Sequence, residues 1–169
     1  MRRYSIILAI IATVLLTGAI ILAHPHFKKT ITTELPSGVE ATVVYNTTPA
    51  NESRARDAAV GSFVTPRRPI LKLSGEIKAG SVTVPAGDYT IGVIKNSESD
   101  WTMALYPGSI ARGQSADMSK VIKLNSTYSE ASGTAEHMLI DISPGSGDLA
   151  GRAVLTLHFG SMLLSGALS

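Results

Sequence analysis

Residues 88–105 read DYTIGVIKNSESDWTMAL, and this stretch decides the fold class. Side chains alternate in character from Asp88 to Lys95, and again from Trp101 to Leu105. The polar residues 96–100 (NSESD) separate the two segments. Alternation with a period of two on both sides of a polar turn predicts two antiparallel strands joined as a hairpin. The alternation also predicts that Trp101 lies in the core rather than on a surface that stacks against a sugar.

Short segments of the same kind recur on both sides of this hairpin. Turn-forming clusters of Gly, Pro, Asn and Ser separate them, whereas residues 51–59 form either one or two helical turns or an irregular loop. Residues 160–169 continue the last strand or add an edge strand. We therefore expect an all-β protein, a single antiparallel β-sandwich or flattened barrel. Its further strands are predicted at 27–35, 39–46, 70–74, 81–84, 120–128, 137–142 and 152–159.

The N-terminus has the pattern of a membrane-targeting segment. Basic residues follow Met1, and the run from Ile6 to Ala23 then contains no charged residue and no proline. A spanning helix needs roughly 20 apolar residues, and the apolar core of a signal peptide has about 7–15. Residues 1–23 therefore predict either a cleaved signal peptide or an uncleaved hydrophobic helix that anchors the chain in the membrane. In both cases we expect residues 24–169 outside the cytoplasm, as a periplasmic, secreted or membrane-tethered β-domain.

Composition excludes several classes of function. The chain has no cysteine, which rules out disulfides, zinc–thiolate sites and cysteine nucleophiles. Beyond residue 23 it contains 13 Lys+Arg and 13 Asp+Glu, whereas a nucleic-acid-binding domain usually carries a basic surplus. We therefore expect no nucleic-acid partner. The doublet Arg67-Arg68 is predicted to be an ordinary solvated charge in a loop.

Two histidines form a candidate metal site. If residues 137–142 and 152–159 pair as a hairpin with Ile142 opposite Ala153, His137 lies opposite His158. Directly opposed side chains have Cβ atoms about 4.5–5.5 Å apart, a separation at which two imidazoles can hold a transition metal. A third ligand would have to come from elsewhere, because Asp141 lies four residues along the strand from His137. The alternative is two sheet histidines satisfied by neighbours or water.

Several short motifs resemble the family of exported bacterial proteins known as domain of unknown function 2911. The best marker is the turn and strand at residues 84–90 (VPAGDYT), followed by a hairpin that ends near Trp101. Further matching segments are 24–29 (HPHFKK), 35–40 (LPSGVE), 101–106 (WTMALY), 136–142 (EHMLIDI) and 157–160 (LHFG). Many members have a Trp-Arg-x-Gly segment where this chain reads FVTPRRP at residues 63–69. The resemblance implies a β-rich exported domain and implies no reaction.

These observations favour an exported, non-enzymatic binding or envelope-associated module over an enzyme. In that interpretation the strands form a scaffold, and the long segments Tyr106–Ser119 and Pro49–Arg56 form the surface that meets a ligand or envelope partner. No catalytic residue and no cofactor are predicted. The membrane is a partner only if the leader is retained. The alternative function is a metal-binding protein, and in some versions a metal-dependent enzyme, that uses His137 and His158.

Overall fold

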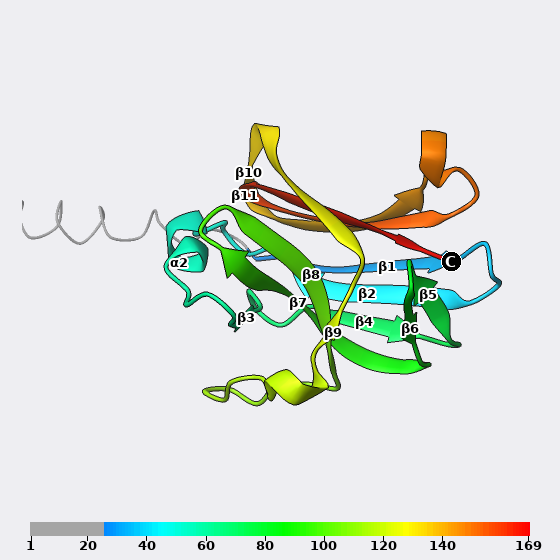
Figure 1. Cartoon of the computed structure of the whole chain (residues 1–169), viewed down its shortest axis with the longest axis horizontal. Helices are drawn as coiled ribbons and strands as arrows, with labels where there is room; N and C mark the ends of the chain where they lie inside the picture. The colour runs from blue at the N-terminus through cyan, green and yellow to red at the C-terminus, as the bar shows by residue number, and fades with distance from the viewer. Residues whose placement is uncertain (1–25) are drawn as a thin grey trace, which may run out of the picture.

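Antiparallel strands make up most of the protein in its computed structural model, which describes residues 26–169 (Figure 1). The predicted leader, residues 1–23, lies outside the described residues. Within the described part, no helix is long and apolar enough to cross a membrane. The helical segments are α2 (Glu52–Arg56) and the two 3-10 turns η1 (Met118–Lys120) and η2 (Gly147–Leu149). The strands are β1 (Lys28–Glu34), β2 (Glu40–Asn46), β3 (Phe63–Val64), β4 (Ile70–Leu73), β5 (Ile77–Ala79), β6 (Val82–Val84), β7 (Gly87–Ser97), β8 (Asp100–Pro107), β9 (Ile122–Lys123), β10 (Ser126–Pro144) and β11 (Ala153–Leu168).

The first layer is a sheet in the order β1-β2-β4-β7-β8-β9, and β3 also pairs with β7. The hairpin predicted from residues 88–105 is β7–β8, with Ile91 opposite Leu105 and Val93 opposite Met103. Trp101 is only 1% exposed, which confirms that it is a core residue. Alternation and turn chemistry therefore located the centre of the sheet correctly.

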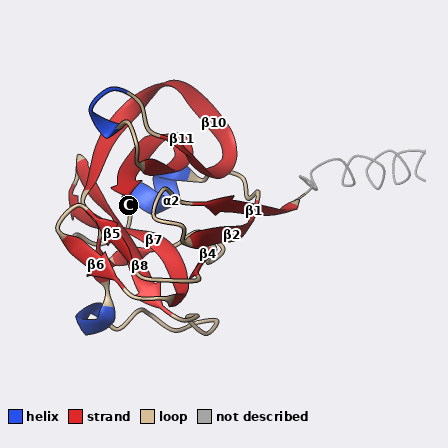
Figure 2. Cartoon of the chain, turned by 90° about the vertical axis from the view of Figure 1, so that its right-hand side faces the viewer, coloured by secondary structure: helices blue, strands red, loops and turns tan. Residues whose placement is uncertain are grey.

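The second layer is the long β10–β11 hairpin, which lies across the first sheet (Figures 1 and 2). Its inward side chains, such as Met138 and Leu155, join one buried apolar cluster with Ile91 and Leu105 of the first sheet. The two layers confirm the all-β, sandwich-like prediction. A small β5–β6 hairpin lies at one end, where the backbone of Lys78 forms two hydrogen bonds with the C-terminal Ser169.

The register of β10 and β11 differs from the predicted one. Ile142 pairs with Leu155 rather than Ala153, and Leu139, not His137, lies opposite His158. The strands remain paired up to Pro144 and Ala153, so the connecting loop is shorter than predicted and contains the η2 turn. Further along, the ladder shifts between Ala135 and Leu139, so that this part of β10 has no regular partner on β11.

Strand β7 is buried on both faces through most of its length, although alternation predicts a single buried face. The second face is covered at Gly92, where Phe63 of the paired strand β3 lies against it. A side chain at Gly92 would overlap the ring of Phe63 and lie 2.7 Å from the carbonyl oxygen of Val64. Glycine is therefore required for β3 to lie this close to β7. This contact places residues 63–68 beside α2 and forms one wall of a cavity.

Candidate functional site

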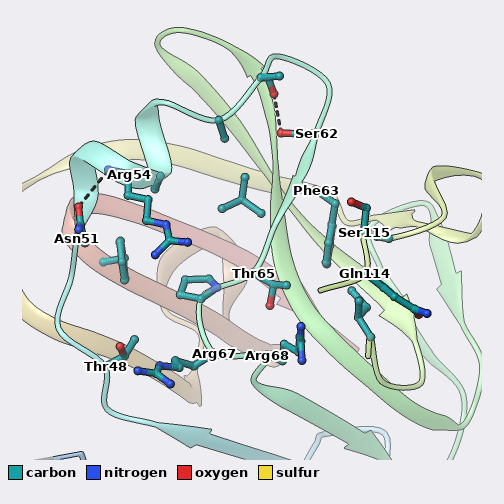
Figure 3. A pocket seen from close by; sticks show the side chains of 18 of the residues that line it. Thr48, Asn51, Arg54, Ser62, Phe63, Thr65, Arg67, Arg68, Gln114 and Ser115 are labelled. Atoms are coloured by element: carbon teal, nitrogen blue, oxygen red, sulfur yellow. Dashed lines mark hydrogen bonds between the residues drawn. The ribbon is translucent and has the colours of Figure 1, made fainter. Parts of the chain in front are cut away.

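A cavity of about 950 Å³ opens between α2, β3 and the loop that follows β8 (Figure 3). Its walls come from residues 48–68 and from residues 110–118, two segments that are distant in sequence. Phe159 of β11 also lines it. The volume is at the upper end of the range usual for small-molecule sites, about 300–1,000 Å³.

Four arginines line this cavity: Arg54, Arg67, Arg68 and Arg112. None of the residues lining it is Asp, Glu, His, Lys or Tyr. In Figure 3, Arg54 extends from α2 into the cavity, Arg67 points toward Thr48, and Arg68 extends toward Thr65. Among the described residues, no salt bridge involves any of the four arginines. The cavity therefore carries a concentrated positive charge that no carboxylate in its lining offsets.

The backbone at Arg67 and Arg68 is strained. Their φ angles are +55° and +50°, in the left-handed region that residues other than glycine seldom adopt, at a cost of about 1–2 kcal/mol each. The Arg68 guanidinium donates a 3.0 Å hydrogen bond to the carbonyl oxygen of Ala111, which ties the 110–118 loop to this turn. Strained residues of this kind cluster at ligand sites, where the surrounding structure holds them in place.

The short helix α2, which carries Arg54, is held by a network of hydrogen bonds. The side chain of Asn51 caps it by accepting from the backbone N–H of Arg54 at 3.1 Å. Arg56 donates to Glu52 within the helix and to Glu130 on β10, both at 2.7 Å. The backbone N–H of Ser161 on β11 donates to Glu52 at 2.7 Å, and the Ser161 hydroxyl lies 2.5 Å from Glu130. This network fixes α2 against the second layer.

Charge pairing within this network shifts the pKa values of its members. Hydrogen bonds from Ser161, Tyr128 and Arg56 lower the pKa of Glu130 to about 2. For Glu52, burial is the largest influence and acts to raise the pKa. The hydrogen bonds from Ser161 and Arg56 outweigh it, so the pKa of Glu52 falls. The hydrogen bond to Glu130 is the main reason that the pKa of Arg56 is raised. Both carboxylates are therefore ionised at neutral pH.

A buried lysine completes the support of α2. Lys95 of β7 is 2% exposed, and its Nζ donates to the carbonyl oxygen of Arg56 at 2.5 Å and to the Glu98 carboxylate at 2.7 Å. The ammonium also lies 5.9 Å from the centroid of the Trp101 ring, within the range of a cation–π interaction. Both layers thus hold the helix, so that the cavity wall it forms is preorganised.

Sequence reasoning located parts of this site and missed its centre. The segments Pro49–Arg56 and Tyr106–Ser119, predicted as the binding surface, both contribute side chains to the cavity. The doublet Arg67-Arg68, predicted to be a solvated loop charge, does lie in a loop with Arg67 exposed, but its turn is strained and lines the cavity, which was not predicted. The available signal was its position between Pro66 and Pro69, which marks a constrained turn. No sequence pattern placed that turn opposite Arg112.

The two candidate metal ligands lie elsewhere. His137 is on the part of β10 that pairs with the segment before α2, with Pro49 opposite it, and His158 is opposite Leu139. The predicted register that joined the two histidines is therefore wrong. Within residues 26–169, no group of three or more His, Asp or Glu side chains is arranged to hold a metal. The Nε2 atom of His158 is buried without a partner among the described residues, and metal binding there stays a prediction.

A scan against protein-family models, a search of curated proteins and a search of solved structures found no match. Function is therefore inferred from the chemistry of the cavity alone. Guanidinium groups donate several hydrogen bonds in a fixed plane and keep their charge at any physiological pH. An arginine-lined cavity without carboxylates is suited to binding oxyanions.

Proposed function

We propose that the protein is an exported binding module of the β-sandwich type, and that its arginine-lined cavity binds an anionic small molecule. The observation that carries this proposal is the set of four arginines in a cavity lined by no carboxylate. Arginines on a protein surface are usually offset by nearby acids, as Arg56 is in this chain. A cation in this cavity would meet only repulsion, whereas a carboxylate or phosphate would gain charge-assisted hydrogen bonds.

Binding fits the residues better than catalysis does. Proton transfer in an active site usually uses His, Asp, Glu, Lys, Tyr or Cys, and the cavity lining contains none of these. Its hydroxyl groups, such as Ser62 and Ser115, have no general base beside them in the lining. Arginine does not lose its proton at physiological pH. The cavity can therefore hold and orient an anion but has no group to move a proton.

The location outside the cytoplasm rests on residues 1–23 and on the resemblance to exported proteins of domain of unknown function 2911. Mass spectrometry of the protein from its host checks it. A start near residue 20 or 24 indicates a cleaved leader, and an intact Met1 in the membrane fraction indicates an anchor. Intact Met1 in the soluble cytoplasmic fraction would contradict export.

Titration calorimetry at low salt tests anion binding, with citrate and inorganic phosphate as the probes. We expect binding by the wild-type protein and at least a tenfold loss of affinity in an Arg67→Ala, Arg112→Ala double variant. Each charge-assisted hydrogen bond is worth about 1.5–3 kcal/mol, and 1.4 kcal/mol corresponds to tenfold. The protein is used with the N-terminus it has in the cell, in nanodiscs of neutral phosphatidylcholine if the leader is retained.

A Lys123→Ala, Arg152→Ala double variant is the matched control. Both residues are exposed and lie outside the cavity, and the variant loses the same two positive charges. It should bind both anions as the wild type does. Equal weakening in the two double variants would show that net charge, not the cavity, is responsible, and absence of binding by the wild type would overturn the proposal.

A further inference from the structure

We infer that the ligand of this cavity is an amphipathic organic anion, with one carboxylate or phosphate head and an aliphatic tail; this inference rests on the proposed function. The arginines account for the head. The remaining lining accounts for the tail, because 11 of the 21 residues that line the cavity are apolar.

The apolar part of the lining is continuous with the core of the protein. Ile110 and Phe159 are 7% and 6% exposed, and Ala55 on α2 is 9% exposed. These three side chains are held in place by the core, and more exposed apolar residues of the lining, such as Phe63 and Met118, offer the surface that a tail would cover. Burial of aliphatic groups against such a surface is favourable in proportion to the apolar area removed from water.

Cavity size favours a ligand larger than a lone inorganic ion. At about 30 Å³ per water molecule, 950 Å³ corresponds to roughly 30 waters. A phosphate ion fills only a small part of that space. The apolar side chains of the lining would then gain no contact from the ligand.

Lining chemistry favours an aliphatic tail over a sugar. Sugar sites usually offer Trp or Tyr faces for stacking, and neither residue lines this cavity. Met118 lines it instead, on the η1 turn, and is 43% exposed. Methionine is unbranched and polarizable, so it adapts to flexible chains of different length. An exposed methionine in the same loop as Arg112 is consistent with a tail that leaves the head at the arginines.

The test is an acid series of increasing chain length: acetate, hexanoate and octanoate, with 1-octanol as the neutral counterpart. Affinity should rise about fourfold for each methylene that leaves water. Octanoate should bind much more tightly than either acetate or 1-octanol. The Arg67→Ala, Arg112→Ala variant should lose octanoate binding. If the proteins are held in nanodiscs, octanoate also partitions into their lipid, and this contribution is the same for the variant and the wild type.

A second variant, Met118→Gln, separates tail from head. Glutamine has nearly the same length, and the exposed position makes misfolding no concern. We expect octanoate to bind about fourfold more weakly, equivalent to one methylene, with acetate and phosphate unchanged. An equal loss for all three anions would contradict a role for Met118 in tail binding.

Failure of this inference and failure of the proposed function give different results. If acetate and octanoate bind equally, the tail is not recognised, and anion binding stands. If octanoate and 1-octanol bind equally, the head is not recognised in the tailed ligand and this inference fails, whereas binding of citrate or phosphate still supports the proposed function. If neither the acids nor phosphate and citrate bind, both proposals are overturned.

The same head-and-tail chemistry occurs in free acids and in membrane lipids, and vesicles distinguish the two sources. Sedimentation is measured with phosphatidylcholine vesicles, with and without phosphatidylglycerol. Phosphatidylglycerol-dependent sedimentation that octanoate prevents, and that the double arginine variant lacks, supports a lipid. Octanoate binding without such sedimentation supports a free acid.

Discussion

Arg54 and Arg56 lie on the same short helix, yet their surroundings are opposite. Arg56 is paired with two carboxylates, one from its own helix and one from β10. Arg54 extends into a cavity where three further arginines and no carboxylate lie. An arginine whose charge is neutralised inside the protein holds the fold together. One whose charge is left unneutralised is available to a ligand, although it contributes little to stability.

The largest expected effect concerns Gly160, which the Arg56 network requires to be glycine. Its φ is +66°, and a Cβ there would overlap the Glu52 carboxylate. We expect Gly160→Ala to reduce the free energy of unfolding by about 3 kcal/mol, through backbone strain and the displaced hydrogen bonds of Glu52. Urea denaturation measures this.

Gly38→Ala is the matched control, because Gly38 has φ +81° and a Cβ at this position would have no neighbouring atom within 4 Å. It should cost only the strain, about 1–2 kcal/mol. Equal losses in the two variants would show that the contact with Glu52 has no energetic role.

The next largest effect comes from replacing each of the two helix arginines by methionine in turn. Arg56→Met leaves Glu52 and Glu130 without their shared cation, and we expect a loss of about 1–2 kcal/mol, since all three side chains are partly exposed. Arg54→Met should change the free energy of unfolding by less than about 0.5 kcal/mol. Similar losses for both would remove the distinction between the two environments.

Acid should weaken the Arg56 network, because its carboxylates become protonated, whereas the arginines of the cavity keep their charge. The pKa of Glu130 is about 2 in the folded protein against 4.5 in an ordinary carboxyl. The unfolded chain therefore binds more protons between these values, so the stabilisation is complete above about pH 4.5 and is lost as pH falls toward 2. Because Glu130 is 54% exposed, screening reduces the contribution to about 1 kcal/mol. Glu130→Gln should flatten the pH dependence of the unfolding midpoint in this window, and an unchanged slope would contradict it.

The smallest effect has the opposite sign. Arg67→Gly removes the strain of a positive φ, and we expect the free energy of unfolding to rise by about 0.5 kcal/mol, after the greater flexibility of glycine in the unfolded chain is subtracted. Citrate binding should weaken in the same variant. Arg112→Gly, at a position without positive φ, should weaken binding with no gain in stability. A rise in the free energy of unfolding in both variants would show that relief of backbone strain does not explain the gain at Arg67.

Local patterns predicted most of the strands, but they missed β3 and β5 and predicted separate strands at 120–128 and 137–142, where β10 runs unbroken from Ser126 to Pro144. Strand partners and the cavity depend on contacts between distant segments. The slip in β10–β11 is two residues, so the same side chains still face the core although each has a different partner. A one-residue slip would have exposed them, and alternation alone excludes it. The length of the closed loop, which sets the register, depends on the η2 turn.

The cavity could not be derived in the same way. Arg67 and Arg112 are 45 positions apart in the chain, and they line one cavity because β3 pairs with β7 beside Gly92 and the loop after β8 folds back toward it. The pairing of Arg56 with Glu130 is equally remote in sequence. Composition showed balanced charge overall, and only the structure shows that none of the acids is among the residues lining the cavity.

The division of the two layers along the chain has a consequence for biogenesis. The first sheet is complete by residue 123, and the layer that covers it is formed entirely by residues 126–168. A polypeptide emerges from the ribosome N-terminus first, so the apolar face of the first sheet stays exposed until the β10–β11 hairpin has been synthesised. During that interval the exposed apolar face is prone to aggregation, and Phe159 completes the cavity only once the final hairpin has formed.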